Sequence, residues 1–352
     1  MRGHLIYTLF LFLSCGLWGQ QHEQYTYAPR TYSCWYTEQA PKIDGKLDEP
    51  MWKEAKRTQP FVDIEGAIRP APYFETFVKM RWDSSYFYLG AQLEETDLWA
   101  TYAERDMVIF HENDFEVFID PDGDSHHYYE LEINALNTIW DLMLTKPYRD
   151  GGKAIDAWDI RDIQHAVHRY GTLNEPSDRD EKWTVEIALP WSVLEEAASH
   201  PGPPRFGETW RVNFSRVHWR TEADPDGGYR KVIDPETGKP YPEYNWVWSP
   251  QGAIAMHQPE TWGVVLFTEA GAAPDSDDIL AKARTTARWA LWQHYYQQKE
   301  YLAQHGQYAS AEALGASGIR VNADRFGFTA SLELEDGWLV IKQDGHINWH
   351  EK

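Results

Sequence analysis

The stretch NDFEVFIDPDGDSHHYYELEIN, residues 113–134, decides the fold class of this chain. In its first half, Phe115, Val117 and Ile119 alternate with mostly acidic residues. Alternation of this kind is typical of a strand that has one buried face. Residues 121–124 then supply turn-forming residues, and the alternation resumes after them. We therefore predict an antiparallel β-hairpin inside an all-β domain.

The same pattern extends over residues 41–268, where short aromatic and β-branched runs are separated by Gly, Pro, Asn and Asp. This spacing is typical of an antiparallel β-sandwich of the immunoglobulin-like or jelly-roll kind. Long polar loops are expected at residues 146–159, 173–181 and 221–243. The predicted strands are Thr76 to Arg81, Tyr86 to Leu93, Phe115 to Ile119, Tyr128 to Asn134, Thr138 to Leu144, Trp183 to Ala188 and Trp210 to Val217.

After residue 268 the pattern changes from strand to helix. Pro274 and Asp275 predict a helix start. Asp336-Gly337 and Asp344-Gly345 predict hairpin turns further along the chain. We expect residues 275–352 to form an extension made of one long α-helix and a β-hairpin region. The apolar residues that recur at helical spacing are Leu280, Ala283, Ala287, Leu291 and Tyr295.

The first 19 residues, 1–19, predict an export signal. Arg2 precedes an apolar run, Leu5 to Leu13, that is too short to cross a bilayer. Cleavage near Gly19 would release the chain, whereas the motif FLSC resembles a bacterial lipobox and would leave Cys15 lipidated. We expect an exported bacterial protein without a transmembrane span, either periplasmic, extracellular or held at the outer membrane as a lipoprotein.

Composition narrows the class of ligand. The 352 residues carry a net charge of −22, which argues against a nucleic acid or an anionic membrane as partner, because those surfaces attract clustered Lys and Arg. Cys15 and Cys34 are the two cysteines, so the mature chain has no disulfide framework and no thiolate metal site. With 18 Trp and 20 Tyr in a polar chain, we expect some rings to meet water or a neutral ligand.

Polar side chains gather on one predicted face of the hairpin. Glu130, Glu132 and Asn134 are two residues apart and therefore point the same way, and we expect Glu116 to share their face. Beside aromatic rings, such a face suits a pyranose, whose C–H faces stack on rings and whose hydroxyls bond to carboxylates and amides. The alternative is the solvated face that antiparallel sheets commonly have.

The stretch EYNWVWSPQG, residues 243–252, supplies a ring for such a site. We predict Trp248 as a stacking platform and Asn245 as its hydrogen-bonding neighbour. In a regular strand Trp246 would share the face of Trp248 while Asn245 pointed away, so this hypothesis requires a bend near Asn245. The alternative is that Trp248 caps the core.

Four segments together resemble a known family: IDGKLDEPMWKEA (43–55), DFEVFIDPDGD (114–124), WTVEIALPW (183–191) and NWVWSPQG (245–252). They are similar to the family 9 carbohydrate-binding modules and their family 9-like relatives, part of the DOMON-type sandwich superfamily. The resemblance implies a β-sandwich that binds sugar between two facing aromatic rings. It also implies structural calcium nearby and frequent attachment to secreted plant-wall hydrolases.

By motif, Trp248 resembles one ring of that clamp, Asn245 its amide and Glu116 its hydroxyl-binding carboxylate. Phe110 stands where the second ring is expected, and a phenyl offers less stacking area than an indole. The expected ligand is a poly- or oligosaccharide. Because the resemblance ends near residue 269 without a hydrolase domain, we expect any partner glycoside hydrolase to be encoded separately. The predicted sugar-binding residues are Trp248, Asn245, Glu116, Phe110, Glu132, Asn134 and Arg216.

Two other classes of protein remain open. One is a b-type haem protein, since some DOMON-type sandwiches bind haem. This sequence has no C-x-x-C-H motif for covalent attachment of haem, and its candidate haem ligands are Met80, Met256 and His257. A glycoside hydrolase needs two carboxylates on opposite sides of a bond, whereas carboxylates two apart on one strand point the same way. We expect a binding protein without catalytic residues and without haem. The hydrolase candidates are Glu116, Glu130, Glu132 and Asp141.

Calcium, in a structural role, is the metal that the family resemblance implies. The run DPDGD, residues 120–124, resembles a calcium loop but lacks the residue spacing of an EF-hand. His126 and His127 are adjacent and so point to opposite faces of a strand, which argues against a shared metal ion. The sequence therefore leaves the metal ligands unassigned.

Overall fold

The computed structural model describes residues 26–315 and 317–352, which belong to two compact units. Residues 29–283 make the larger unit, and residues 26–28, 284–315 and 317–352 make the smaller one. The predicted export signal and Cys15 lie outside the described residues. Among the helices of the described ranges, none is long and apolar enough to cross a membrane.

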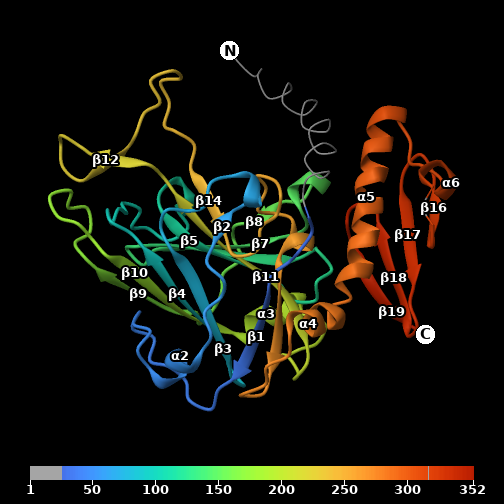
Figure 1. The fold of residues 1–352 in the computed structure, drawn as a ribbon, viewed down its shortest axis with the longest axis horizontal. Coiled ribbons are helices and arrows are strands. Elements are labelled where there is room, and N and C mark those ends of the chain that lie inside the picture. The colour runs from blue at the N-terminus through green and yellow to red at the C-terminus, as the bar shows by residue number, and fades with distance from the viewer. Residues whose placement is uncertain (1–25, 316) are drawn as a thin grey trace. The chain divides into compact units, whose positions relative to one another are not determined.

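The larger unit is built on one sheet of 13 strands (Figure 1). All seven strands predicted from sequence are present, and their ends differ from the prediction by at most two residues. The all-β prediction is therefore confirmed. The strands are β1 (Thr31–Tyr36), β2 (Val62–Asp63), β3 (Thr76–Trp82), β4 (Tyr86–Glu94), β5 (Asp114–Asp120), β6 (Tyr128–Asn134), β7 (Ile139–Leu144), β8 (Ala154–Ile155), β9 (Gln164–Tyr170), β10 (Lys182–Pro190), β11 (Thr209–His218), β14 (Tyr244–Val247) and β15 (Gly263–Thr268).

The strand order is β8-β7-β6-β5-β11-β15-β1-β3-β4-β10-β9, with β14 paired to β11 and β2 paired to β14. β1 pairs in parallel with both β15 and β3, while the hairpin strands β5 and β6 pair antiparallel. The sheet curls around one large core that includes Trp82, Leu131, Val185 and Phe214. This curled sheet is consistent with the predicted β-sandwich.

Short elements connect the strands. Helix α2 (Pro50–Glu54) precedes β2, α3 (Trp191–Leu194) follows β10, and a 3₁₀ turn, η2 (Ile109–His111), precedes β5. The predicted loop at residues 221–243 contains a two-stranded ribbon, β12 (Thr221–Ala223) and β13 (Tyr229–Lys231). The segment from residue 108 to 112 leads directly into the hairpin of β5 and β6.

The smaller unit is a helix packed on a four-stranded antiparallel sheet (Figure 1). Leu291, Trp292 and Tyr295 of the helix α5 pack against Phe328 and Leu339 of the sheet. The predicted hairpin turns are therefore confirmed as parts of one meander. The elements are α5 (Thr285–His305), α6 (Ala311–Leu314), β16 (Ile319–Ala323), β17 (Phe328–Glu333), β18 (Gly337–Lys342) and β19 (Ile347–Glu351).

The predicted long helix is present as α5, but it begins at Thr285 and not near residue 275. Asp275 does begin a helix, α4 (Ser276–Lys282), and its carboxylate accepts a hydrogen bond from the Asp278 main-chain N–H at 2.9 Å. Arg284 then adopts a left-handed conformation with φ of 50°, and α5 starts afresh at Thr285. The apolar residues of α4 pack in the larger unit, so the predicted stripe is divided between two cores.

Candidate functional site

The acidic hairpin and its neighbours build one continuous polar face. Glu116 of β5 lies opposite Glu132 of β6 and opposite Ser215 of β11. On the far side of β11, Val217 lies opposite Asn245 of β14. Paired residues in an antiparallel ladder share a face, so these side chains lie together. We call this surface the acid face, and it comprises Asp114, Glu116, Glu130, Glu132, Ser215 and Asn245.

The carboxylates of the acid face are buried, which excludes the solvated-face alternative. The exposed fractions are 4% for Glu116, 1% for Glu132 and 0% for Asp114. Burial raises the pKa of Glu116 to about 7. Burial, followed by the negative charges of neighbouring carboxylates, also raises the pKa values of Asp114, Glu130 and Glu132. Four acids held this way favour protonation or a ligand that supplies donors or positive charge.

Several oxygens of the acid face are unused. The Phe110 main-chain N–H donates to Oε2 of Glu132 at 2.9 Å, and the Val217 N–H donates to Oδ1 of Asp114 at 3.2 Å. Within the described residues, no hydrogen bond reaches Oε1 of Glu132, Oδ2 of Asp114 or Oε2 of Glu116. Buried oxygens without partners are rare in native proteins, and each requires an explanation.

Aromatic rings border the acid face. Phe110 in η2 is 36% exposed, and its ring lies nearly parallel to that of Trp140, with centroids 6.4 Å apart. Trp140 lies on β7 directly opposite Glu132. The Trp219 indole donates to the Phe110 carbonyl at 2.9 Å, and the Lys231 ammonium lies 3.1 Å from the Trp219 ring centre. Phe110 therefore presents a partly open ring beside buried carboxylates.

Trp140 and Trp219 were missed at the level of sequence. For Trp140 a signal existed, because it alternates with Ile139 and Asp141 and so falls on the polar face once β7 pairs with β6. For Trp219 there was none, since it lies after the end of β11.

Trp248 requires a correction, because it lies in the core. It is 0% exposed and packs against Phe214, with ring centroids 5.8 Å apart. β14 pairs regularly with β11, so Trp246 and Trp248 point to the core while Asn245 points to the acid face. The bend that the stacking hypothesis required is absent. In this arrangement the Trp248 ring is not offered to a ligand, whereas the half-buried Asn245 amide is on the correct face.

Arg216 and Asn134 also have structural roles in place of the predicted contacts to sugar. Arg216 is buried on the core side of β11, where it pairs with Glu95 at 2.9 Å and donates to the Glu94 carbonyl at 2.7 Å. The Asn134 side chain is fully used, because its amide donates to the Tyr102 carbonyl and to Glu112 while its oxygen accepts two main-chain N–H groups. Neither side chain is available to a ligand.

The residues considered for other chemistry are dispersed. Asp141 pairs with Arg105 and lies opposite Leu131, so it faces away from the acid face. Met80 is buried in the main core. His257 bonds to the Tyr128 hydroxyl at 3.1 Å, and burial lowers its pKa to about 4. The structure therefore keeps Glu116 and Glu132 side by side and separates them from Asp141.

A family model described as "Carbohydrate family 9 binding domain-like" matches residues 43–270. The chain belongs to this family. The match confirms the resemblance expected from the four sequence segments. It covers the whole acid face and excludes the smaller unit.

Solved structures of family 9 modules are similar at low identity. A module from Caldicellulosiruptor kristjanssonii in complex with cellotriose is 14% identical, with a TM-score of 0.43 over 70% of this chain and 100% of that one. Its complex with glucose is 15% identical, with a TM-score of 0.43 over 70% and 100%. A Bacteroides uniformis protein provisionally described as carbohydrate-binding is 16% identical, with a TM-score of 0.48 over 68% and 100%. A search of curated proteins finds no match.

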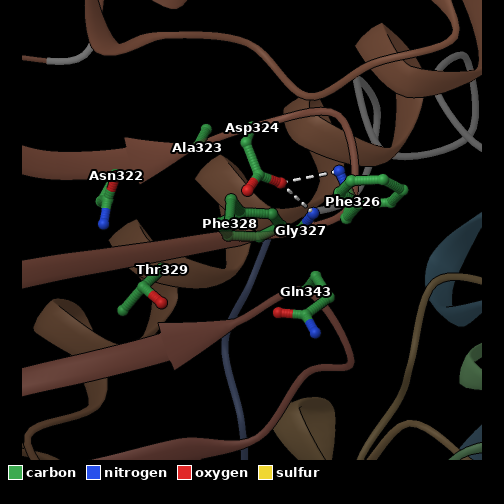
Figure 2. Close-up of a pocket in the computed structure, with 8 residues that line it drawn as sticks. All are labelled: Asn322, Ala323, Asp324, Phe326, Gly327, Phe328, Thr329 and Gln343. Carbon is green, nitrogen blue, oxygen red and sulfur yellow. Dashed lines mark hydrogen bonds between the residues drawn. The ribbon is translucent and has the colours of Figure 1, made fainter.

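The smaller unit has a hollow of its own, of about 330 Å³, next to the turn between β16 and β17 (Figure 2). The Asp324 carboxylate is its one charged lining group. Figure 2 shows that this carboxylate turns back on its own loop, where it accepts the N–H groups of Phe326 and Gly327 at 2.7 and 3.0 Å. The acid face is therefore the stronger candidate site.

Proposed function

We propose that this chain binds a poly- or oligosaccharide on the acid face. The observation that supports this most is the partly open Phe110 ring, whose own N–H bonds to a buried carboxylate of that face. The Phe110 ring can stack on the C–H face of a sugar. Glu116 and Glu132 can accept hydrogen bonds from the sugar hydroxyls, and the Asn245 amide can both donate and accept hydrogen bonds. Membership of a carbohydrate-binding family agrees with this assignment.

We also propose that the protein is exported and supports carbohydrate catabolism beside a separately encoded glycoside hydrolase. An array of plant-wall and microbial glycans, probed with the full mature chain, tests the binding. We expect selective binding to one class of polysaccharide. A chain that is folded by circular dichroism and binds no glycan on the array would refute the proposal.

Phe110 offers the sharpest test of the sugar contact. Truncating a stacking ring typically costs about 2 kcal/mol, so we expect Phe110→Ala to weaken glycan affinity roughly 30-fold in a calorimetric titration. Phe110→Trp should tighten binding by enlarging the ring. The matched control is Phe206→Ala, because Phe206 is 55% exposed in the same unit and lies away from the acid face. Equal affinity in Phe110→Ala and the native chain would remove Phe110 from the site.

Structural calcium fits the turn between β5 and β6. Carboxylate oxygens of Asp120, Asp122 and Asp124 lie within 4.8 Å of one another, and oxygen ligands are those that calcium prefers. Main-chain N–H groups orient them, since Gly123 and Ser125 both donate to Asp120 at 3.0 Å. We call these three residues the turn site. A cation there would hold the hairpin that carries Glu116 and Glu132.

Chelation should therefore lower the melting temperature. A ligand at 100 times its dissociation constant stabilises a fold by about 2.7 kcal/mol, so EDTA should lower the melting temperature and added calcium should restore it. In the double variant Asp122→Asn, Asp124→Asn, calcium should raise the melting temperature by less than it does in the native chain. A native chain with the same melting curve in EDTA and in calcium would leave these aspartates as turn-forming residues alone.

A further inference from the structure

Four groups of carboxylates in the described chain are close enough to hold a cation, and three of them have partners. In the first, Glu186 accepts hydrogen bonds from the Trp52 indole and from two main-chain N–H groups. In the second, Asp141 is paired with Arg105. The third is the turn site, whose carboxylates accept main-chain N–H groups. The fourth group is Asp114, Glu116 and Glu132 on the acid face.

The fourth group differs because its oxygens lack partners. Oδ2 of Asp114, Oε2 of Glu116 and Oε1 of Glu132 are buried without a hydrogen bond from any described residue. The Ser215 hydroxyl gives a second, independent sign. It is 0% exposed, and because Ser215 lies directly opposite Glu116 in the register of β11 and β5, that carboxylate is its only hydrogen-bond partner among the described residues. Three carboxylate oxygens on one face thus lack a hydrogen-bond donor, and a buried hydroxyl lies beside them.

The protein itself supplies no neutralising charge here. Within the described ranges, none of these three carboxylates forms an ion pair with Lys, Arg or His. The Lys231 ammonium lies over the Trp219 ring, whose indole donates to the Phe110 carbonyl. Burying several ionised carboxylates without a counter-charge is very costly, and a bound metal ion is one of the few groups that offsets it.

We propose that Asp114, Glu116, Glu132 and the Ser215 hydroxyl form a buried binding site for a hard divalent cation, with calcium as the best fit. One oxygen from each of the three carboxylates lies within 4.8 Å of the others. Oxygens bound to a common calcium ion at about 2.4 Å can be at most about 4.8 Å apart, whereas magnesium needs a tighter set. Hydroxyl and carboxylate oxygens, without nitrogen or sulfur, select this class of metal.

The site has a consequence for the sugar contact that rests on the proposed function. A cation would keep Glu116 and Glu132 ionised, with fixed orientations, at the base of the surface that Phe110 borders. Saccharide affinity should then fall when the metal is removed. The metal site itself does not depend on sugar binding, and it can be measured alone.

The experiment is a calorimetric titration of the metal-stripped full chain with calcium chloride, and separately with magnesium chloride. The background is the double variant Asp122→Asn, Asp124→Asn, which silences the turn site. We expect this background still to bind one equivalent of calcium, and to bind magnesium more weakly. Adding Asp114→Asn or Glu132→Gln should weaken calcium binding by more than about tenfold.

These variants should preserve the fold. Asn and Gln retain the oxygens that accept the Val217 and Phe110 N–H groups, so circular dichroism should remain native. Glu38→Gln is the control for the loss of one negative charge, because Glu38 is exposed and lies outside all four carboxylate groups. It should keep the equivalent of bound calcium.

No calcium uptake by the folded background variant would overturn the proposal, and so would uptake that Asp114→Asn and Glu132→Gln leave unchanged. If these two variants unfold, Glu116→Gln in the same background takes their place, and calcium uptake that it leaves unchanged would also overturn the proposal. Calcium uptake without any glycan binding would support the metal site and contradict the sugar proposal. Glycan binding without calcium uptake would support the sugar proposal and contradict the metal site.

Discussion

Replacing Trp248 with alanine should destabilise the larger unit by about 3–5 kcal/mol. The indole is 0% exposed and contributes to the main core, so its removal loses buried apolar contacts and leaves a cavity. We expect a lower midpoint in urea unfolding, monitored by circular dichroism. Phe110→Ala is the control, because a partly exposed ring at the rim should change the midpoint far less.

A substitution at Gly263 tests the packing of the Trp248 ring, because Gly263 lies against that ring. A Cβ atom on Gly263 would lie 2.4 Å from the Trp248 ring, closer than any real contact, so Gly263→Ala should also destabilise the unit. A Trp248→Ala protein with native stability and lost glycan binding would mean that the ring faces a ligand after all.

Replacing Arg216 with alanine should also cost about 3–5 kcal/mol, because it takes the guanidinium away from buried Glu95 and leaves His218, at 3.4 Å, as the remaining side chain that pairs with this carboxylate. The burial of both side chains is nearly complete, so water cannot replace the missing charge. Urea unfolding of Arg216→Ala, Glu95→Ala and the double variant measures the coupling. We expect the double variant to be much more stable than the sum of the two single effects predicts.

The exposed pair Arg230 and Glu222 is the control for this cycle. Its side chains are about half exposed, and surface pairs of this kind contribute about 0–1 kcal/mol. If Arg216→Ala has native stability and weakened glycan binding, Arg216 contacts the sugar, as the sequence analysis predicted.

The strands could be predicted because alternation is a local property of each segment. The same rule also gave the shared face of Glu116 and Glu132, which the pairing of β5 and β6 confirms. Burial of that face could not be predicted, because it depends on how η2 folds back onto β6 and on β14, which lies far along the chain. Periodicity describes which way a side chain points, and it does not reveal what will cover it.

For Trp248, strand periodicity and motif resemblance gave different predictions, and the structure agrees with periodicity. The period of two placed Trp248 with Trp246 and opposite Asn245, as the structure has it. The motif resemblance placed Trp248 and Asn245 in one site, which required a bend that does not occur. The break at Arg284 had no signal of either kind, since neither Gly nor Pro stands between α4 and α5.

The position of β1 affects how the chain can fold. This strand comes first in the larger unit, yet it lies between β15 and β3, with Thr31 opposite Val264. Its hydrogen bonds to β15 therefore cannot form until nearly the whole unit has been synthesised. Closing so long a loop is slow, which predicts a late, cooperative final step in folding. Until this pairing forms, β1 and β15 each have one edge without hydrogen-bond partners. Unpaired strand edges promote aggregation, so the chain should be most prone to aggregate just before this last pairing.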